Sequence, residues 1–272
     1  MSRIDSQNTP DNYYYQRKSP QAAELGYWIA TAATGLLYEA LPSFSNPFLK
    51  QMTKEHSKNY LYKDSFIKAV ELSGLKKQGL EIVNETNLAT DIGKGLNACF
   101  VPSTKKIKLN IEKASITGFH ELGHAMNNMK GSFGRILQKL RVPGMALAGL
   151  MGSIALLSRD KPKGEKRNLF DWIQDNSAKI AFAGMLPVVA EEALASFKGI
   201  QMANKAGLGK TLIQNLKKFY GKALLSYGGY ALITGTSVYL ASKIMETFTR
   251  PEKREINYDD NFSRMVPSGF RI

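Results

Sequence analysis

The pattern of apolar and polar positions divides the chain into strand-like runs and helical segments. Strand-like runs lie at 80–85, 95–101 and 105–110, and the last of them, KKIKLN, alternates charged and apolar residues as a half-exposed strand does. Pro-Ser-Thr separates the second and third runs, which is a hairpin signal. The other segments have helical spacing or are continuously apolar. The pattern predicts an α+β protein, mainly α-helical, with a small β-sheet.

Long apolar runs lie on both sides of the strand-like region. The first is uncharged over 25–38, which falls short of the roughly 20 residues that a membrane-spanning helix needs. Later runs cover 142–158, 181–190 and 223–242, and the last is uncharged over about 20 residues. The run at 181–190 is too short alone and contains Pro187. We therefore expect apolar, membrane-associated helices, mainly on the evidence of 223–242.

Polar segments at both ends and a change of pattern near residue 79 suggest four parts. The expected parts are a flexible polar arm at 1–20, a helical segment with a short apolar helix at 21–78, a main domain with the three later apolar helices at 79–250, and a polar tail at 251–272.

Charge and cysteine content narrow the function classes. Lys and Arg number 37 against 23 Asp and Glu, a formal charge of +14 that suits an acidic partner such as an anionic membrane surface. No nucleic-acid partner is expected, because the chain has no RNP-type motif, Cys/His finger spacing or Gly-rich phosphate loop. The single cysteine, Cys99, excludes an intramolecular disulfide and a cysteine-based zinc site.

The sequence HELGH carries the clearest chemical signal. His120 and His124 are four residues apart, so on a helix both imidazoles lie on one face and can bind the same metal ion. Glu121 lies beside the first histidine, where a general base for a metal-bound water must be. The third histidine, His56, lies far upstream without a partner at ligand spacing, and we interpret it as an ordinary surface residue.

A zinc ion in a hydrolytic site takes three protein ligands and leaves a fourth position open. With no further histidine at hand, the third ligand should be a carboxylate. Glu191 and Glu192 are adjacent acids in an apolar stretch, where burying them is costly unless a cation compensates. Neighbours on a helix point about 100° apart, so only one can face the ion, and the other can orient a ligand histidine or pair with a basic group. Alternatively, both are helix N-terminal acids after Pro187.

HELGHA, followed by Glu192-Ala193-Leu194-Ala195-Ser196 as E-x-x-A-S, resembles the gluzincin metallopeptidases. The similarity is greatest to the membrane-bound HtpX-like proteases, the CAAX prenyl proteases and the YugP-like zinc peptidases. The resemblance implies a zincin-like core at 79–250 with one Zn²⁺ per chain, bound by His120, His124 and Glu192, and Glu121 as general base. Glu191 then orients a ligand or serves as an alternative one.

The same resemblance implies a substrate and a location. Asn97 and Ala98 correspond to an edge strand along which a peptide substrate lies, with GLNACFV or KKIKLN as the candidate edge. The substrate is expected to be a peptide or a membrane protein, with membrane lipid as a further partner and the site facing the cytoplasm. These families often use an additional residue to stabilise the oxyanion, and the candidates are Tyr227, Tyr230, Tyr239 and Arg250.

Two other interpretations remain open at this stage. One is a metal-binding membrane scaffold without catalysis, supported by the lack of an obvious oxyanion-stabilising histidine after His124. The other is a basic helical protein that binds a membrane or nucleic acid and whose histidine pair is incidental. Retained metal without peptide cleavage is expected of the first, and no bound metal of the second.

Overall fold

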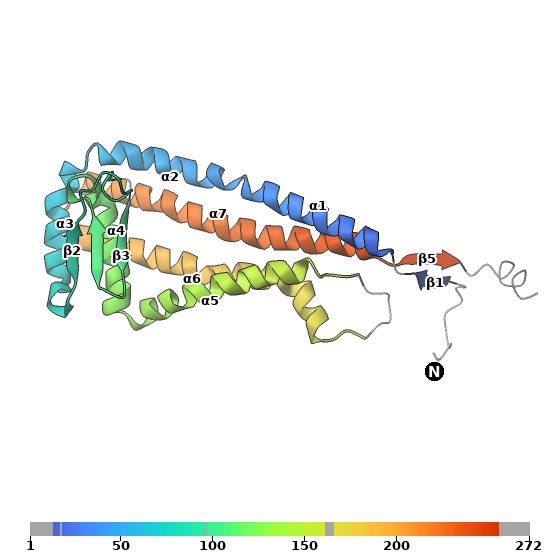
Figure 1. Ribbon diagram of the computed structural model, residues 1–272. Coiled ribbons are helices and arrows are strands. Elements are labelled where there is room, and N and C mark those ends of the chain that lie inside the picture. The colour runs from blue at the N-terminus through green and yellow to red at the C-terminus, as the bar shows by residue number, and fades with distance from the viewer. Residues whose placement is uncertain (1–12, 17, 96, 161–165, 256–272) are drawn as a thin grey trace, which may run out of the picture.

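The protein is elongated and mainly helical, with a small three-stranded mixed sheet at one end (Figure 1). The computed structural model describes residues 13–16, 18–95, 97–160 and 166–255. This architecture confirms the predicted fold class at the level of a mainly α-helical protein with a small sheet.

Seven α-helices and five strands make up the described part of the chain. The helices are α1 (Pro20–Tyr38), α2 (Leu41–His56), α3 (Tyr60–Ser73), α4 (Ile111–Met129), α5 (Ser132–Ala155), α6 (Leu169–Lys205) and α7 (Lys210–Thr249), with a short 3₁₀ helix at Lys76–Gln78. The strands are β1 (Tyr13–Gln16), β2 (Glu81–Asn84), β3 (Ala98–Val101), β4 (Lys106–Leu109) and β5 (Glu252–Glu255).

The three-stranded sheet has the order β2-β4-β3, with β2 parallel to β4 and β3 antiparallel to it. All three strand predictions fall on observed strands. Of the two candidates for the edge strand, GLNACFV contains β3, which is at an edge, whereas KKIKLN contains β4, which is the central strand. Alternation predicts which side chains are buried, here Ile107 and Leu109, but does not predict which strands pair on either side. The edge strand beside α4 is β3.

A core of large side chains holds the sheet end together. α4 packs on the sheet, on α3 and on α6, and the ends of α6 and α7 contribute to the same core. Phe66 of α3 and Phe119 of α4 meet edge to face with ring centroids 5.5 Å apart, and both are fully buried. Burial of such large aromatic rings removes much apolar surface from water and fixes the position of α4.

A second core lies farther along the long helices and is built from smaller side chains. Its buried members come from α1, α5, α6 and α7, and they are alanines, methionines and one valine, as the following set shows: Ala30, Ala148, Met151, Ala155, Ala181, Met185, Ala231, Val238, Ala241 and Met245. α5 and α6 cross where a Cβ on Gly144 would lie 2.2 Å from the carbonyl oxygen of Gly184. Small residues therefore let the helices approach closely here.

The predicted apolar runs lie inside helices longer than the runs themselves. The 142–158 run ends α5, and 223–242 forms the middle of α7. The 181–190 run does not form a short helix of its own. It lies within α6, which is 37 residues long and continues through Pro187. Packing against α5 and α7 over most of this length offsets the hydrogen bond that a proline removes from a helix.

Within the described residues, α6 is the single helix that is long and apolar enough to cross a membrane by length and composition. The buried core helices of soluble proteins meet the same criterion. The expectation of membrane-associated helices had rested mainly on 223–242. This run lies in α7, which does not meet the criterion, because tyrosines, serines, threonines and glycines lower its mean hydropathy.

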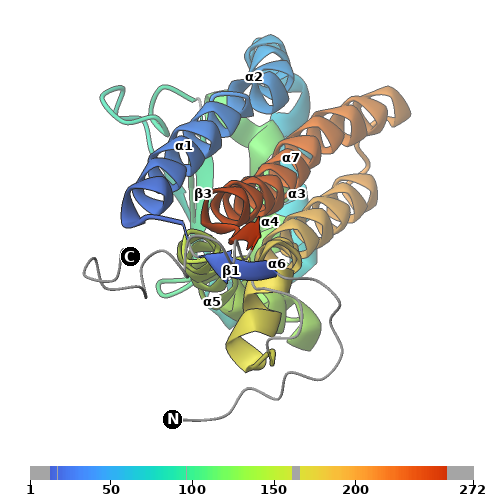
Figure 2. The ribbon, with the colours of Figure 1, turned by 90° about the vertical axis from the view of Figure 1, so that its right-hand side faces the viewer.

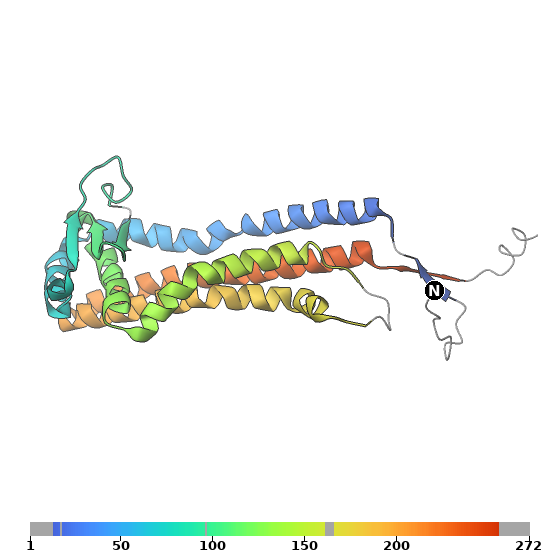
Figure 3. The ribbon, with the colours of Figure 1, turned by 60° about the horizontal axis from the view of Figure 1, so that its bottom comes forward.

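Viewed along the long axis, α7 lies between α1 on one side and α5 and α6 on the other (Figure 2). At the end away from the sheet, β1 pairs antiparallel with β5 (Figure 3). Residues 13–16 of the predicted flexible arm thus form a strand, in keeping with the strand propensity of a tyrosine run. Residues 1–12 and 256–272 of the predicted arm and tail, and the side chain of His56, lie outside what the structure describes.

Candidate metal centre

α4 and α6 cross with their backbones in contact, and this crossing brings the two sequence motifs together. A Cβ on Gly123 would lie 1.9 Å from the carbonyl oxygen of Ala195, and one on Gly199 would lie 2.4 Å from that of Phe119. No side chain fits at either position. The close approach explains why glycine stands inside HELGH, and it sets the histidines of α4 opposite the adjacent glutamates of α6.

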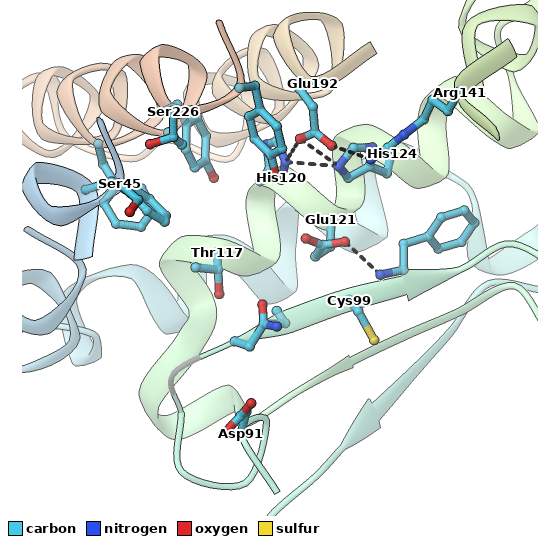
Figure 4. Close-up of a pocket in the computed structure, with 18 of the residues that line it drawn as sticks. Ser45, Asp91, Cys99, Thr117, His120, Glu121, His124, Arg141, Glu192 and Ser226 are labelled. Carbon is cyan, nitrogen blue, oxygen red and sulfur yellow. Dashed lines mark hydrogen bonds and ion pairs between the residues drawn. The ribbon is translucent and has the colours of Figure 1, made fainter. Parts of the chain in front are cut away.

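Three ligand-type atoms converge at this crossing (Figure 4). The Nε2 atoms of His120 and His124 are 2.9 Å apart. The Oε2 atom of Glu192 lies 3.0 Å from Nε2 of His120 and 3.6 Å from Nε2 of His124. Residues as far as 72 positions apart in the chain therefore form one compact triangle of nitrogen and oxygen atoms.

The size of this triangle fits a tetrahedral zinc ion. Zn–N and Zn–O bonds of about 2.0–2.2 Å place tetrahedral ligands about 3.3–3.6 Å apart. One observed separation, 3.6 Å, equals that edge length, and the other two, 2.9 and 3.0 Å, are somewhat shorter. A divalent cation held by these three atoms would have a fourth position left for another ligand.

The hydrogen bonds around the histidines leave the two Nε2 atoms free to act as ligands. Nδ1 of His124 lies 2.9 Å from Oε1 of Glu191, and Nδ1 of His120 lies 3.1 Å from Oγ of Ser196. With a proton on each Nδ1, both Nε2 atoms present lone pairs to each other and to a carboxylate oxygen. Such an arrangement repels itself unless a cation or a proton compensates it.

Glu191 does not face the triangle but lies behind His124, fully buried. Its Oε1 also accepts hydrogen bonds of 2.9 Å from the side-chain amides of Asn127 and Gln138. A carboxylate that orients a ligand histidine is a recurring feature of metal sites, where it fixes the tautomer and raises the basicity of the ring. Glu191 therefore has both of the roles considered for the second glutamate, because it contacts His124 through Oε1 and pairs with the guanidinium of Arg141 through Oε2 at 2.9 Å.

We use "the cluster" for His120, His124 and Glu192 together with the adjacent Glu121 and Glu191. The electrostatics of this cluster favour positive charge. Burial lowers the pKa of His124, but the hydrogen bonds that its ring donates to Glu191 and Glu192 and the charge of Glu121 outweigh burial and raise this pKa to about 10. The surrounding carboxylates therefore attract a cation, whether a proton or a metal ion.

Glu121 lies on the cavity side of the triangle and is held by the sheet. Its Oε2 accepts a hydrogen bond of 2.7 Å from the backbone N–H of Phe100 on β3. Burial raises the pKa of Glu121, while the nearby His124 and His120 and the Phe100 N–H act in the opposite direction. A carboxylate with a raised pKa beside a metal position has the properties required of a general base.

A cavity of about 850 Å³ opens beside the cluster, between α2, β3, α4 and α7. The predicted site residues that line it are His120, Glu121, His124, Glu192, Asn97 and Ala98. Apolar side chains from three elements, among them Phe48, Phe100 and Phe219, form much of the remaining wall. The cavity is much larger than one amino-acid side chain, and it joins the triangle to the edge strand.

Of the four candidates for an oxyanion-stabilising residue, one lines the cavity and three lie elsewhere. Tyr227 of α7 lines the cavity together with Glu121 and Glu192. Tyr230 instead packs edge to face against Tyr38 with ring centroids 6.4 Å apart, and Tyr239 is 55% exposed. The guanidinium of Arg250 donates a hydrogen bond of 2.8 Å to Asp160, at the opposite end of the bundle.

Several residues around the cluster were not identified from sequence. Arg141 and Gln138 come from α5, Asn127 from the end of α4, and Tyr220 from α7, where its hydroxyl donates a hydrogen bond of 2.6 Å to the carbonyl oxygen of Ile116. In the sequence, Arg141 is only one of several basic residues that precede the apolar run at 142–158. Its one signal is that it is the last charge before that run, which does not reveal a partner 50 residues away.

The site thus combines a compact triangle of ligand-type atoms, a carboxylate held on the sheet and a cavity, built from residues of five helices, of β3 and of the segments beside β3. We compared the chain with protein-family models, curated proteins and solved structures, and none of them matched.

Proposed function

We propose that the protein is a membrane-associated, zinc-dependent endopeptidase with a zincin-like core. The observation that carries this proposal is the triangle of His120 Nε2, His124 Nε2 and Glu192 Oε2, with sides of 2.9, 3.0 and 3.6 Å, at the edge of a large cavity that Glu121 also lines. The triangle supplies three protein ligands and leaves one side open, as hydrolytic zinc sites do.

Zinc bound at this position would lower the pKa of a water molecule toward about 7 and polarise the scissile carbonyl. Glu121 then accepts the proton of the attacking water and returns it to the leaving amine. The raised pKa of Glu121 supports this role, because a base whose pKa lies closer to neutrality can both take up and release a proton. The Phe100 N–H aims the carboxylate and leaves its Oε1 free for that transfer.

Tyr227 is the residue that we propose to stabilise the developing oxyanion. It lines the cavity beside the cluster, and the other three candidates lie elsewhere, as described above. A hydroxyl that donates to the oxyanion of the tetrahedral species lowers the barrier more than the energy of the ground state. Its position also weakens the case for a scaffold without catalysis, which had rested on the apparent lack of such a residue.

The substrate is proposed to lie along β3, where it adds a strand to the sheet. The backbone N–H groups of Ala98 and Phe100 point away from β4, toward the side chains of Asn97 and Glu121 respectively. In an antiparallel strand the C=O of a residue points to the same side as its N–H. The carbonyls of Ala98 and Phe100 thus face the cavity side, where a peptide can donate hydrogen bonds to them.

Membrane association is supported by the arrangement of apolar side chains on the long helices. The interior of the bundle contains alanine and methionine, whereas large apolar residues lie outside, among them Trp28, Leu36, Leu150, Phe182 and Leu232. A bundle in water has the reverse arrangement, and small residues between helices are typical of membrane proteins. The length and hydropathy of α6 agree with this proposal.

The decisive test combines metal analysis with peptide hydrolysis in purified full-length protein. In Glu121→Gln we expect zinc to remain near one per chain while hydrolysis of an unstructured protein, followed by mass spectrometry, falls by about 10²–10⁴-fold. Glu112→Gln is the matched control, because Glu112 lies on the same helix, pairs with Lys63 and is far from the cavity wall.

Two results would overturn the proposal. Wild-type protein that holds no zinc when purified with the metal present would exclude the metal centre. Hydrolysis that continues in Glu121→Gln at the wild-type rate would exclude Glu121 as the base.

A further inference from the structure

Arg141 contacts both of the adjacent glutamates of α6. One terminal nitrogen of its guanidinium lies 2.9 Å from Oε2 of Glu191, and the other lies 2.9 Å from Oε1 of Glu192. The two arms of one planar group thus bind two different carboxylates, and the fixed geometry of the fork sets their separation. Figure 4 shows Arg141 on the far side of Glu192 from His120.

The position of Arg141 follows from the packing of α5. This helix begins three residues after the end of α4. The contact between α5 and α6 is more extensive than that between any other two helices of the described chain. Gln138 lies one turn before Arg141 on the same face, and its amide also donates to Glu191. One face of α5 is therefore directed at the glutamate pair.

Each glutamate consequently divides its two oxygens between two partners. Glu191 accepts from His124 with Oε1 and from Arg141 with Oε2. Glu192 directs Oε2 to the histidine triangle and Oε1 to Arg141. With Oε1 held by the guanidinium, Glu192 can offer a metal ion one oxygen only.

The charges of the site balance when Arg141 is included. Glu121, Glu191 and Glu192 contribute −3 and Arg141 contributes +1, and a divalent cation brings the sum to zero. Without Arg141, the buried carboxylates of Glu191 and Glu192 would lose their shared cationic partner, and both oxygens of Glu192 would be free to bind a metal ion.

We propose that Arg141 is a positioning residue of the metal centre, which keeps Glu192 a one-oxygen ligand and so keeps the fourth coordination position available to water and substrate. This inference rests on the proposed zinc peptidase function. It predicts that the loss of Arg141 alters the coordination of the metal rather than the amount bound, because a more negative site with an additional free oxygen attracts a cation at least as well.

The test uses full-length protein loaded with Co²⁺, whose visible absorption weakens as its coordination number rises from four to five. We expect Arg141→Met to bind one Co²⁺ per chain with weaker visible bands than the wild type. In the zinc form we expect kcat for peptide hydrolysis to fall by about 10–100-fold with little change in KM, because Arg141 acts through Glu192 and not on the substrate.

Arg135→Met is the matched control, since Arg135 lies on the same helix and donates to the carbonyl oxygen of Asn128, outside the cavity wall. It should behave as the wild type. Arg141→Lys keeps the charge but not the fork, and it remains informative if Arg141→Met does not fold. We expect its Co²⁺ spectrum also to differ from that of the wild type.

A wild-type Co²⁺ spectrum and wild-type kcat in both Arg141 variants would overturn the inference and leave the proposed function intact. A wild-type spectrum in Arg141→Lys alone would show that charge suffices, and it would overturn the positioning role of the fork. A rise in KM with an unchanged spectrum would make Arg141 a substrate-binding residue instead. Failure of the wild type to bind Co²⁺ or Zn²⁺ would count against the proposed function itself.

Discussion

The two ends of the molecule bury different side chains. At the sheet end, large aromatic residues such as Tyr62, Phe66 and Phe119 are fully buried. Along the bundle of α1, α5, α6 and α7 the buried residues are mostly alanine and methionine, while leucines and tryptophans lie outside. The first end follows the pattern expected in water and the second the pattern expected in lipid. Hydropathy alone does not distinguish the two, because the direction of the large side chains carries the information.

The cluster of His120, His124 and Glu192 lies at the junction of these two regions. α4 belongs to the sheet end, whereas α6 and α7 run from it into the bundle. Three apolar runs begin or end beside cluster residues: Val142 follows Arg141, Ala190 precedes Glu191, and Ala223 precedes Tyr227 by four positions. Substitutions on either side of this junction should therefore have different consequences.

Tyr227 gives the largest expected effect, because it is a residue of a bundle helix that reaches the cavity. Removal of one oxyanion-stabilising donor in Tyr227→Phe should lower kcat by about 10²–10³-fold. Tyr230→Phe, on the same helix but outside the cavity, should retain wild-type kcat. The measurement is steady-state hydrolysis of a fluorogenic peptide, and equal kcat values in the two variants would remove Tyr227 from the mechanism.

Two leucines of nearly equal exposure compare the regions directly. Leu72 of α3 is 54% exposed and Leu232 of α7 is 55% exposed. Leu232→Lys should weaken membrane association by about 3 kcal/mol, roughly a hundredfold in partition, since a charge would enter the lipid. Leu72→Lys should have little effect. The measurement is flotation of protein synthesised in the presence of phospholipid vesicles, and equal partition of both variants would contradict a lipid-facing bundle.

Two glycine substitutions compare a close contact between helices with a position that has free space around it. A Cβ on Gly123 would overlap the carbonyl of Ala195, whereas one on Gly149 of α5 meets nothing within 4 Å. Gly123→Ala should cost about 1–3 kcal/mol of unfolding free energy and reduce zinc content, because α6 must move away from the histidines. Gly149→Ala should be neutral or stabilising by up to about 1 kcal/mol. Denaturant unfolding in detergent, with metal analysis, measures both, and a wild-type zinc content in Gly123→Ala would contradict the packing argument.

The last prediction concerns the cluster alone: the affinity for a metal ion should depend on pH. The pKa of His124 is raised to about 10, so a metal ion must displace a proton from it at any lower pH. Apparent Zn²⁺ affinity should therefore fall by about tenfold for each unit by which the pH is lowered. Competition with a chelator between about pH 6 and 8 measures this slope, and an affinity that does not change with pH would contradict it.

Local patterns predicted much of this structure. The three strands and the HELGH helix follow from spacing within short segments. The approach of Glu192 to the histidines was expected instead from two adjacent acids in an apolar stretch and from the resemblance to the gluzincins. The role of KKIKLN as a central strand did not, because it depends on a parallel partner, β2, about 25 residues earlier. The continuation of α6 through Pro187 did not either, since tertiary packing overrode a local helix-breaking signal.

The residues around the ligands were the least predictable part of the site. Arg141 and Gln138 acquire their roles only when α5 is folded back against α6, and an arginine before an apolar run is a common feature of many helices. Tyr227 was one of four candidates with no local feature to separate it from the others. Its selection required knowing which turn of α7 passes the cavity.

The hydrogen bond from Phe100 to Glu121 joins the proposed base to the strand on which a peptide would dock. A ligand that shifts this strand also shifts the carboxylate, so docking and reactivity are mechanically coupled. If the proposed function holds, a peptide that fits the strand would leave the carboxylate in place, and one that distorts the strand would turn it away. Discrimination among peptides can therefore arise from the alignment of the base, in addition to the shape of the cavity wall.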